Sequence, residues 1–175
     1  MSDQITRAIT QLQGAVRESP SAAKAVFRAT TSSHQDSFAT TSQVRTFTLG
    51  LDEPEALGGA DTGPNPVEAV LAALGSCQAI VYRAYANALG LRLDKVEVEA
   101  RGHLDIRGFL GDSSVPAGFE RVAFTTRVTS PEPAERIAEL SRLVEAHCPV
   151  LDILRRAIPV TGALEHTRSS AAVAA

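Results

Sequence analysis

Two cysteines are the residues of this 175-residue chain best suited to covalent chemistry. Cys77 follows a run of small and apolar residues, and Cys148 lies 71 positions later, directly before a proline. This separation matches neither the CxxC pattern of redox motifs nor the short spacings of zinc ligands. The glycine-rich segment before Cys77 lacks the patterns that bind nucleotide phosphates. We therefore expect a thiol pair that the fold brings together, and we expect no metal site and no bound cofactor.

Each cysteine also has an ordinary structural explanation. Cys77 is predicted to lie on a helix among apolar neighbours, and free cysteine is among the most often buried residue types. Apolar burial disfavours the reactive thiolate, so Cys77 needs a nearby cation to react. Cys148 is predicted at a helix break before Pro149, where it either fills the kink or meets the favourable field at the start of the next helix. His147 would point about 100° away on a helix, which predicts a surface residue.

Arg45 is the residue that interrupts an apolar pattern. Residues 44–51 predict a strand on which Arg45 shares a face with Phe47 and Leu49. A guanidinium on that face either extends to water or pairs with an anion such as a thiolate. Arg28, on the preceding predicted strand, is the alternative partner for a thiolate.

Glu68 has a complete structural explanation at the start of the longest predicted helix. Asn65 can cap that helix, Pro66 suits its first position, and Glu68 follows the cap by three residues, as in a capping box. On a helix, Glu68 lies on the side opposite Cys77 and about 13 Å away along the axis. It cannot assist Cys77 of its own chain, so a catalytic contribution would have to cross a subunit interface.

The remaining pattern predicts an α+β domain with mostly antiparallel strands. Helical spacing of apolar residues, with proline and glycine boundaries, predicts helices at residues 3–18, 66–89, 130–147 and 150–157. Alternation and strand-forming residue types predict strands at residues 25–31, 44–51, 93–106, 119–129 and 158–164. Residues 31–42 and 53–65 are expected to be loops. We expect a helical extension at residues 1–20, a single domain at residues 24–165 and a disordered tail at residues 166–175.

Composition narrows the function classes. A hydrophobic content of 44% and a charged content of 21% are typical of a soluble globular protein. A net charge of −3 gives no basic surface for nucleic acid. The chain has no uninterrupted apolar run long enough for a membrane span, and its first residues lack the apolar core of a signal peptide. We therefore expect a cytoplasmic protein, a location in which a thiol pair is more often reactive than structural.

The segments around both cysteines resemble the OsmC/Ohr family of thiol peroxidases. The matching segments are TGPNPVEAVLAALGSC, which ends at Cys77, and HCPV, which contains Cys148. Weaker matches, LDEPEALGG and RGFLG, extend the resemblance over roughly residues 24–165. The resemblance implies an OsmC-like fold in which mostly antiparallel sheets pack on a central helix pair. It also implies an intertwined homodimer with its sites at the subunit interface.

By this resemblance, Cys77 matches the peroxidatic cysteine and Cys148 the resolving cysteine. The implied reaction is reduction of an organic hydroperoxide through a Cys77 sulfenic acid and a Cys77–Cys148 disulfide, with regeneration by an external dithiol of lipoyl type or a small thiol. Arg45 lies in the region of the family's thiolate-stabilising arginine. The family's active-site glutamate directly follows the NP dipeptide, where this chain has Val67, and Glu68 comes one position later.

Two alternatives to a peroxidase remain. One is a non-catalytic, stress-associated dimer that binds a small hydrophobic ligand in its interface groove, which the displaced glutamate favours. The other is a plain disulfide oxidoreductase, which the cysteine spacing disfavours.

Overall fold

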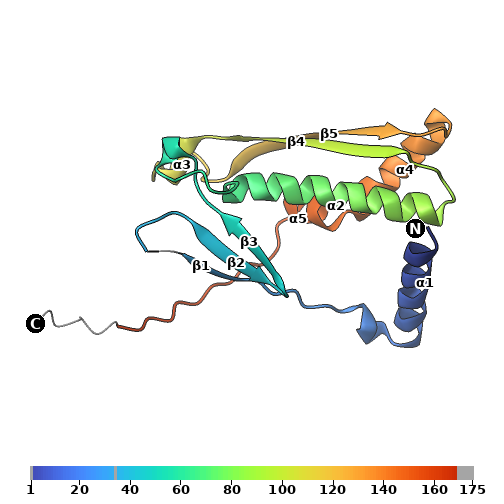
Figure 1. Cartoon of the computed structure of the whole chain (residues 1–175), viewed down its shortest axis with the longest axis horizontal. Coiled ribbons are helices and arrows are strands. Elements are labelled where there is room, and N and C mark those ends of the chain that lie inside the picture. Colours follow the sequence, from blue (N-terminus) through green and yellow to red (C-terminus); the bar gives the residue numbers. More distant parts are fainter. Residues whose placement is uncertain (1, 34, 169–175) are drawn as a thin grey trace, which may run out of the picture.

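Two antiparallel sheets and one long central helix form the framework of the protein in the computed structural model, which describes residues 2–33 and 35–168 (Figure 1). The helices are α1 (Ser2–Glu18), α2 (Pro66–Ala88), α3 (Ile106–Phe109), α4 (Ala134–His147) and α5 (Pro149–Arg155), with 3-10 turns at Pro20–Ala23 and Glu55–Leu57. The strands are β1 (Thr30–Ser33), β2 (Thr40–Val44), β3 (Phe47–Leu51), β4 (Lys95–Leu104) and β5 (Phe119–Thr129). The predicted α+β class with antiparallel pairing is confirmed.

The main layer consists of the β4–β5 sheet with α2 lying along it and α4 and α5 beside α2 (Figure 1). β4 and β5 pair from Lys95 opposite Thr129 to Leu104 opposite Phe119, with an irregularity near the last pair. Apolar side chains of both strands face the helices, whereas the charged residues of the other face form ion pairs such as Arg127 with Glu99. The alternation predicted for these two segments is therefore present, because only one face of the sheet is covered by helices.

Two apolar clusters fill the space between this sheet and the helices. The larger one, which we call the distal cluster, has six buried members: Tyr82, Ala86, Leu91, Leu93, Leu140 and Val144. The smaller one, which we call the thiol cluster, contains Leu74, Cys148 and Leu151, with Cys77 packed against it. Burial at positions 74, 78, 82 and 86 follows the helical repeat of α2, so a single stripe of that helix reaches both clusters.

The N-terminal half differs from the sequence prediction. The strand expected at residues 25–31 begins only at Thr30, and the loop expected at residues 31–42 contains most of β1 and the start of β2. The strand expected at residues 44–51 begins only at Phe47, because Arg45 and Thr46 form the turn between β2 and β3. Cross-strand bonds between hydroxyl groups stabilise this polar sheet, as between Thr31 and Ser42 at 2.7 Å.

Two differences concern the second half. α4 begins at Ala134, later than expected, because Ser130 accepts a hydrogen bond from the Glu132 backbone and ends the preceding extended segment. Residues 158–164 do not form the expected strand, and no strand of the described chain lies paired beside them. The tail expected at residues 166–175 has neither helix nor strand at residues 166–168, and its remainder lies outside the described residues.

The three-stranded sheet projects away from the helical layer (Figure 1). Apolar side chains on and before it are left open to solvent, with Phe27 93% exposed and Phe47 62% exposed. On α2, Ile80 is 65% exposed. By length and composition α2 could cross a membrane. Within the chain, one side of this helix packs on β4, α4 and α5.

Candidate active site

The two thiols meet where α2 passes the break between α4 and α5. Cys77 lies in the middle of α2 and is half-buried, whereas Cys148 is 1% exposed. Cys77 packs against the buried cluster that contains Cys148, its proximity contributes to raising the pKa of Cys148, and both cysteines are free. The fold thus joins two residues that are far apart in the sequence.

Pro149 causes the helix break that positions Cys148. A proline disfavours the helical conformation of the residue before it, and Cys148 is extended at φ −80° and ψ 112°. Proline also suits the first position of the next helix, which begins there as α5. The Cys148 carbonyl accepts a hydrogen bond from the Asp152 N–H at 2.9 Å. Leu74 and Leu151 then enclose the sulfur on the apolar side.

Burial determines the protonation of Cys148. It is the largest cause raising the pKa of this thiol above its ordinary value, while the N–H of Leu151 lowers the pKa and contact with Cys77 raises it. The favourable effect expected from the start of the next helix is therefore present but is outweighed by burial. At neutral pH, Cys148 is a neutral thiol, and Cys77 is the sulfur that an external reagent reaches.

We expect iodoacetamide to label Cys77 well before Cys148 in the folded, reduced protein at pH 7. Only the thiolate is alkylated, and Cys148 is both buried and protonated. Its labelling should accelerate only at a pH above the ordinary thiol value, because burial raises the pKa of Cys148. Peptide mapping by mass spectrometry after timed quenching gives the order. Equal labelling of both cysteines at pH 7 would contradict the burial of Cys148.

Arg45 does not lie on an apolar strand face, and that part of the prediction is wrong. It occupies the β2–β3 turn with a positive φ of 55°, and its guanidinium lies 5.1 Å from the centre of the Phe47 ring. Arg28 lies in the extended segment before β1 and lines the same exposed hollow as Arg45. Within residues 2–33 and 35–168, no hydrogen bond or ion pair joins either arginine to a cysteine. Neither Arg28 nor Arg45 therefore supplies a cation to the thiols of its own chain within the described residues.

Glu68 forms the capping box that the sequence predicts. Its carboxylate accepts from the Asn65 N–H at 2.9 Å, and the Asn65 side chain accepts from the Glu68 N–H at 2.9 Å. Glu68 is exposed in the first turn of α2, remote from Cys77 on the same helix. His147 is exposed, as predicted, and its ring lies 5.3 Å from that of Tyr85.

Asp52 anchors the loop that leads into α2, and the sequence analysis did not single it out. Its buried carboxylate accepts from the N–H groups of Glu53, Ala60 and Thr62 and from the Thr62 hydroxyl, at 2.8–3.2 Å. These bonds, that of the Thr62 hydroxyl first, lower the pKa of Asp52 below its ordinary value. The sequence feature that could have indicated this role is an acidic residue at the end of a strand, followed by a glycine-rich loop that contains a threonine.

Replacement of this carboxylate gives a pH-dependent loss of stability. Because the pKa of Asp52 is lowered on folding, its ionised form stabilises the protein above about pH 3.9. That contribution is lost as the pH falls through the lower folded value. We therefore expect Asp52→Asn to be less stable than the parent at pH 7, with the difference narrowing below about pH 4. Urea unfolding from pH 7 to pH 3 measures this, with exposed Asp61→Asn as the control. A difference independent of pH would contradict the assignment.

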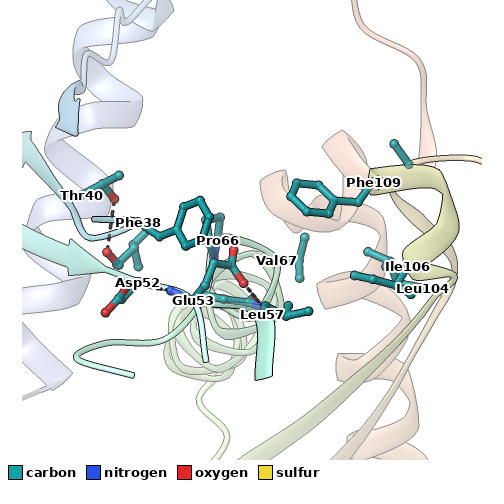
Figure 2. Close-up of a pocket in the computed structure, with 13 residues that line it drawn as sticks. Phe38, Thr40, Asp52, Glu53, Leu57, Pro66, Val67, Leu104, Ile106 and Phe109 are labelled. Carbon is teal, nitrogen blue, oxygen red and sulfur yellow. Dashed lines mark hydrogen bonds between the residues drawn. The ribbon is translucent and has the colours of Figure 1, made fainter. Parts of the chain in front are cut away.

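An apolar cavity of about 320 Å³ lies at the N-terminal end of α2, beside the capping box (Figure 2). Phe38 and Phe109 are both among the side chains that line it (Figure 2). Val67 precedes Cys77 by ten residues, or about 15 Å along the helix, so this cavity is separate from the thiols of the same chain. Its walls are mostly apolar: Phe38, Leu51, Leu57, Val67, Leu104, Ile106, Phe109 and Ala117.

No group of three or more His, Cys, Asp or Glu side chains in the described part of the chain could hold a metal ion.

The comparisons with known proteins include one match to a protein family and one sequence relative. Residues 58–162 match the family described as "OsmC-like protein". A protein of Haloferax volcanii, described as uncharacterized, is 35% identical over 122 residues, which cover 69% of this chain and 82% of that protein.

Solved structures share the fold. An OsmC-like protein from Mycoplasma pneumoniae has a TM-score of 0.65 at 20% identity, covering 75% of this chain and 89% of that one. The organic hydroperoxide resistance protein OsmC from Legionella pneumophila has a TM-score of 0.57 at 21% identity, covering 75% and 92%. The family match over residues 58–162, more than half of the chain, shows that this chain belongs to the OsmC-like protein family.

Proposed function

We propose that this protein reduces organic hydroperoxides with Cys77 as the attacking residue and Cys148 as the resolving residue. The observation that carries the proposal is the contact between two free thiols, one half-buried and one buried and neutral. The Cys77 thiolate attacks the outer oxygen of the hydroperoxide, and the O–O bond breaks. After proton transfer, the products are an alcohol and a Cys77 sulfenic acid.

The second step uses the buried thiol. Cys148 attacks the sulfenic sulfur, a disulfide forms, and the oxygen leaves as water with the thiol proton. An external dithiol, of lipoyl type or a pair of small thiols, then reduces the disulfide by exchange and is itself oxidised. The fold shared with proteins described as organic hydroperoxide resistance proteins, from Legionella pneumophila and Elizabethkingia anophelis, supports this reaction class.

We propose that the working unit is a cytoplasmic homodimer. The uncovered three-stranded sheet and the exposed apolar positions of α2, such as Ile80, support a second copy that covers them. In that arrangement, Arg45 and Glu68 of one copy act on Cys77 of the other, since neither reaches Cys77 of its own chain. Sedimentation at micromolar concentration should give twice the chain mass, and a stable monomer would contradict the dimer.

Replacing Arg45 tests its role as a thiolate partner. We expect Arg45→Ala to slow the reaction of reduced protein with cumene hydroperoxide at pH 7 by about tenfold or more, because loss of an adjacent cation disfavours the thiolate. Arg28→Ala, in the same exposed hollow, is the matched control. Stopped-flow measurement of thiol loss gives both rates. An unchanged rate for Arg45→Ala with a slow Arg28→Ala would transfer the role to Arg28.

A thiol titration tests the function itself. Reduced protein mixed with one equivalent of cumene hydroperoxide should lose both thiols, release cumyl alcohol and contain an intrachain Cys77–Cys148 disulfide. Addition of dihydrolipoamide should then restore both thiols and allow turnover. Retention of both thiols after prolonged exposure would reject the peroxidase proposal.

The apolar cavity favours a second candidate, a binding protein for a small hydrophobic ligand. This candidate predicts saturable binding of a fluorescent apolar probe and no loss of thiols to hydroperoxide. Val67→Phe, which would occupy part of the cavity, should weaken that binding.

A further inference from the structure

Gln78 is the most unusual polar residue of the core. It follows Cys77 on α2 and is 0% exposed, and both polar atoms of its carboxamide lack a hydrogen-bond partner among the described residues. The hydroxyl of Thr126 on β5 is likewise buried and without a partner there. The great majority of buried polar groups in proteins have a hydrogen-bond partner. Three buried polar atoms without one in a single core therefore need an explanation.

The two residues lie at the same level between the two apolar clusters. Along α2, Gln78 stands midway between Leu74 of the thiol cluster and Tyr82 of the distal cluster, about 6 Å from each along the axis. Along β5, Thr126 stands midway between Phe124 and Val128, which pack against the same two clusters, about 7 Å from each. We call Gln78 and Thr126 the polar layer.

The polar layer also coincides with the helix break. On α4, Val144 belongs to the distal cluster and Cys148 to the thiol cluster, so the layer meets the last turn of α4. Carbonyls in the last turn of a helix have no intrahelical donor. Glu145 in particular would receive its bond from residue 149, and Pro149 has no N–H. Acceptors for the Gln78 amide are therefore available at this level of the core.

We propose that Gln78 is a positioning residue for the thiol–disulfide step, unpaired in the dithiol form and hydrogen bonded once the Cys77–Cys148 bond has closed. This inference rests on disulfide formation as part of the proposed function. Bond formation draws the sulfurs from contact to covalent distance, which moves the α4–α5 break toward α2. The same movement brings the last carbonyls of α4 to the carboxamide. The free-energy cost of the unpaired carboxamide is present in the dithiol form and absent from the disulfide form, so Gln78 favours oxidation.

The test is the equilibrium between protein dithiol and protein disulfide in mixtures of reduced and oxidised dithiothreitol. In this exchange, the reagent's disulfide takes two electrons and two protons from Cys77 and Cys148. Gln78→Met keeps the length of the side chain and removes its hydrogen bonding. We expect its oxidation constant to fall by about tenfold, the scale of one or two hydrogen bonds. For this two-electron couple, tenfold corresponds to about 30 mV.

Thr126→Val keeps the shape of the side chain and removes the other unpaired group of the polar layer. It should shift the oxidation constant in the same direction, and it provides a second test if Gln78→Met does not fold. Tyr82→Phe is the control, because it changes a buried residue of the same α2 stripe one turn farther from Cys148 and should leave the constant unchanged. Unfolding of each form provides a second readout. Gln78→Met should stabilise the reduced form and not the oxidised form.

The outcomes separate this inference from the proposed function. Equal stabilisation of both forms with an unchanged oxidation constant would overturn it, because Gln78 would then be only a core residue. A parent protein that forms no Cys77–Cys148 disulfide with oxidised dithiothreitol would overturn it as well. A shifted constant in a protein that does not consume hydroperoxide would support the role of Gln78 and reject the peroxidase.

Discussion

Cys77→Ser should abolish hydroperoxide consumption, with a fall in turnover of at least about 10³-fold, the scale of losing a catalytic nucleophile. A serine hydroxyl at this position is not ionised at neutral pH, and Cys148 cannot replace the lost thiolate because burial raises its pKa. Coupled turnover with dihydrolipoamide and cumene hydroperoxide measures the loss. Residual activity above one tenth of the parent would place the nucleophile elsewhere.

Cys148→Ser is the matched variant, because it removes the other sulfur and leaves Cys77 in place. It should still consume about one equivalent of hydroperoxide in a single rapid phase and then stop when no disulfide can form. Dimedone should trap the Cys77 sulfenic acid in this variant. Loss of the rapid phase would mean that Cys148, rather than Cys77, reacts first.

Leu74→Ala should give a large loss of stability, about 2–5 kcal/mol in the free energy of unfolding. Leu74 is 0% exposed and packs against Cys148 and Leu151, so truncation leaves a cavity where α2 meets the helix break. The same cavity loosens the enclosure of Cys148, so its alkylation at pH 7 should become faster. Urea unfolding and timed labelling measure the two effects.

Leu89→Ala, at the exposed end of α2, is the control for this substitution. Surface truncations usually change stability by less than about 1 kcal/mol. A loss that small for Leu74→Ala would show that the thiol cluster does not depend on this leucine. A large loss of unfolding free energy without faster labelling of Cys148 would show that Leu74 stabilises the fold but does not enclose the sulfur.

The sequence by itself determined the elements whose causes are local. The capping box of Asn65 and Glu68, the alternation of β4 and β5, and the break before Pro149 each depend on residues within a few positions of one another. For that reason, the α+β class, the start of α2 and the place of Cys148 at a helix break were predictable. The resemblance around both cysteines added the family, which the comparisons then established.

Other features depended on tertiary structure. Arg45 could not be placed because a two-residue reversal within residues 44–51 carries no glycine or asparagine signal, and a straight strand explains the same pattern. The segment at residues 158–164 has strand-forming residues but no partner strand in the described chain, and a strand needs a partner. Asp52 gained its role only when a loop of distant N–H groups closed around it.

The candidate site likewise depends partly on local sequence and partly on tertiary packing. The sequence supplied two thiols and the helix break, but their contact depends on how α2 packs against α4 and α5. Burial of Cys148 and of Gln78 is likewise a property of that packing, since neither residue type has a fixed degree of exposure. Local pattern therefore determined which residues could react. Only the packing of three helices on a sheet decided which sulfur is buried and protonated and which one an external reagent reaches.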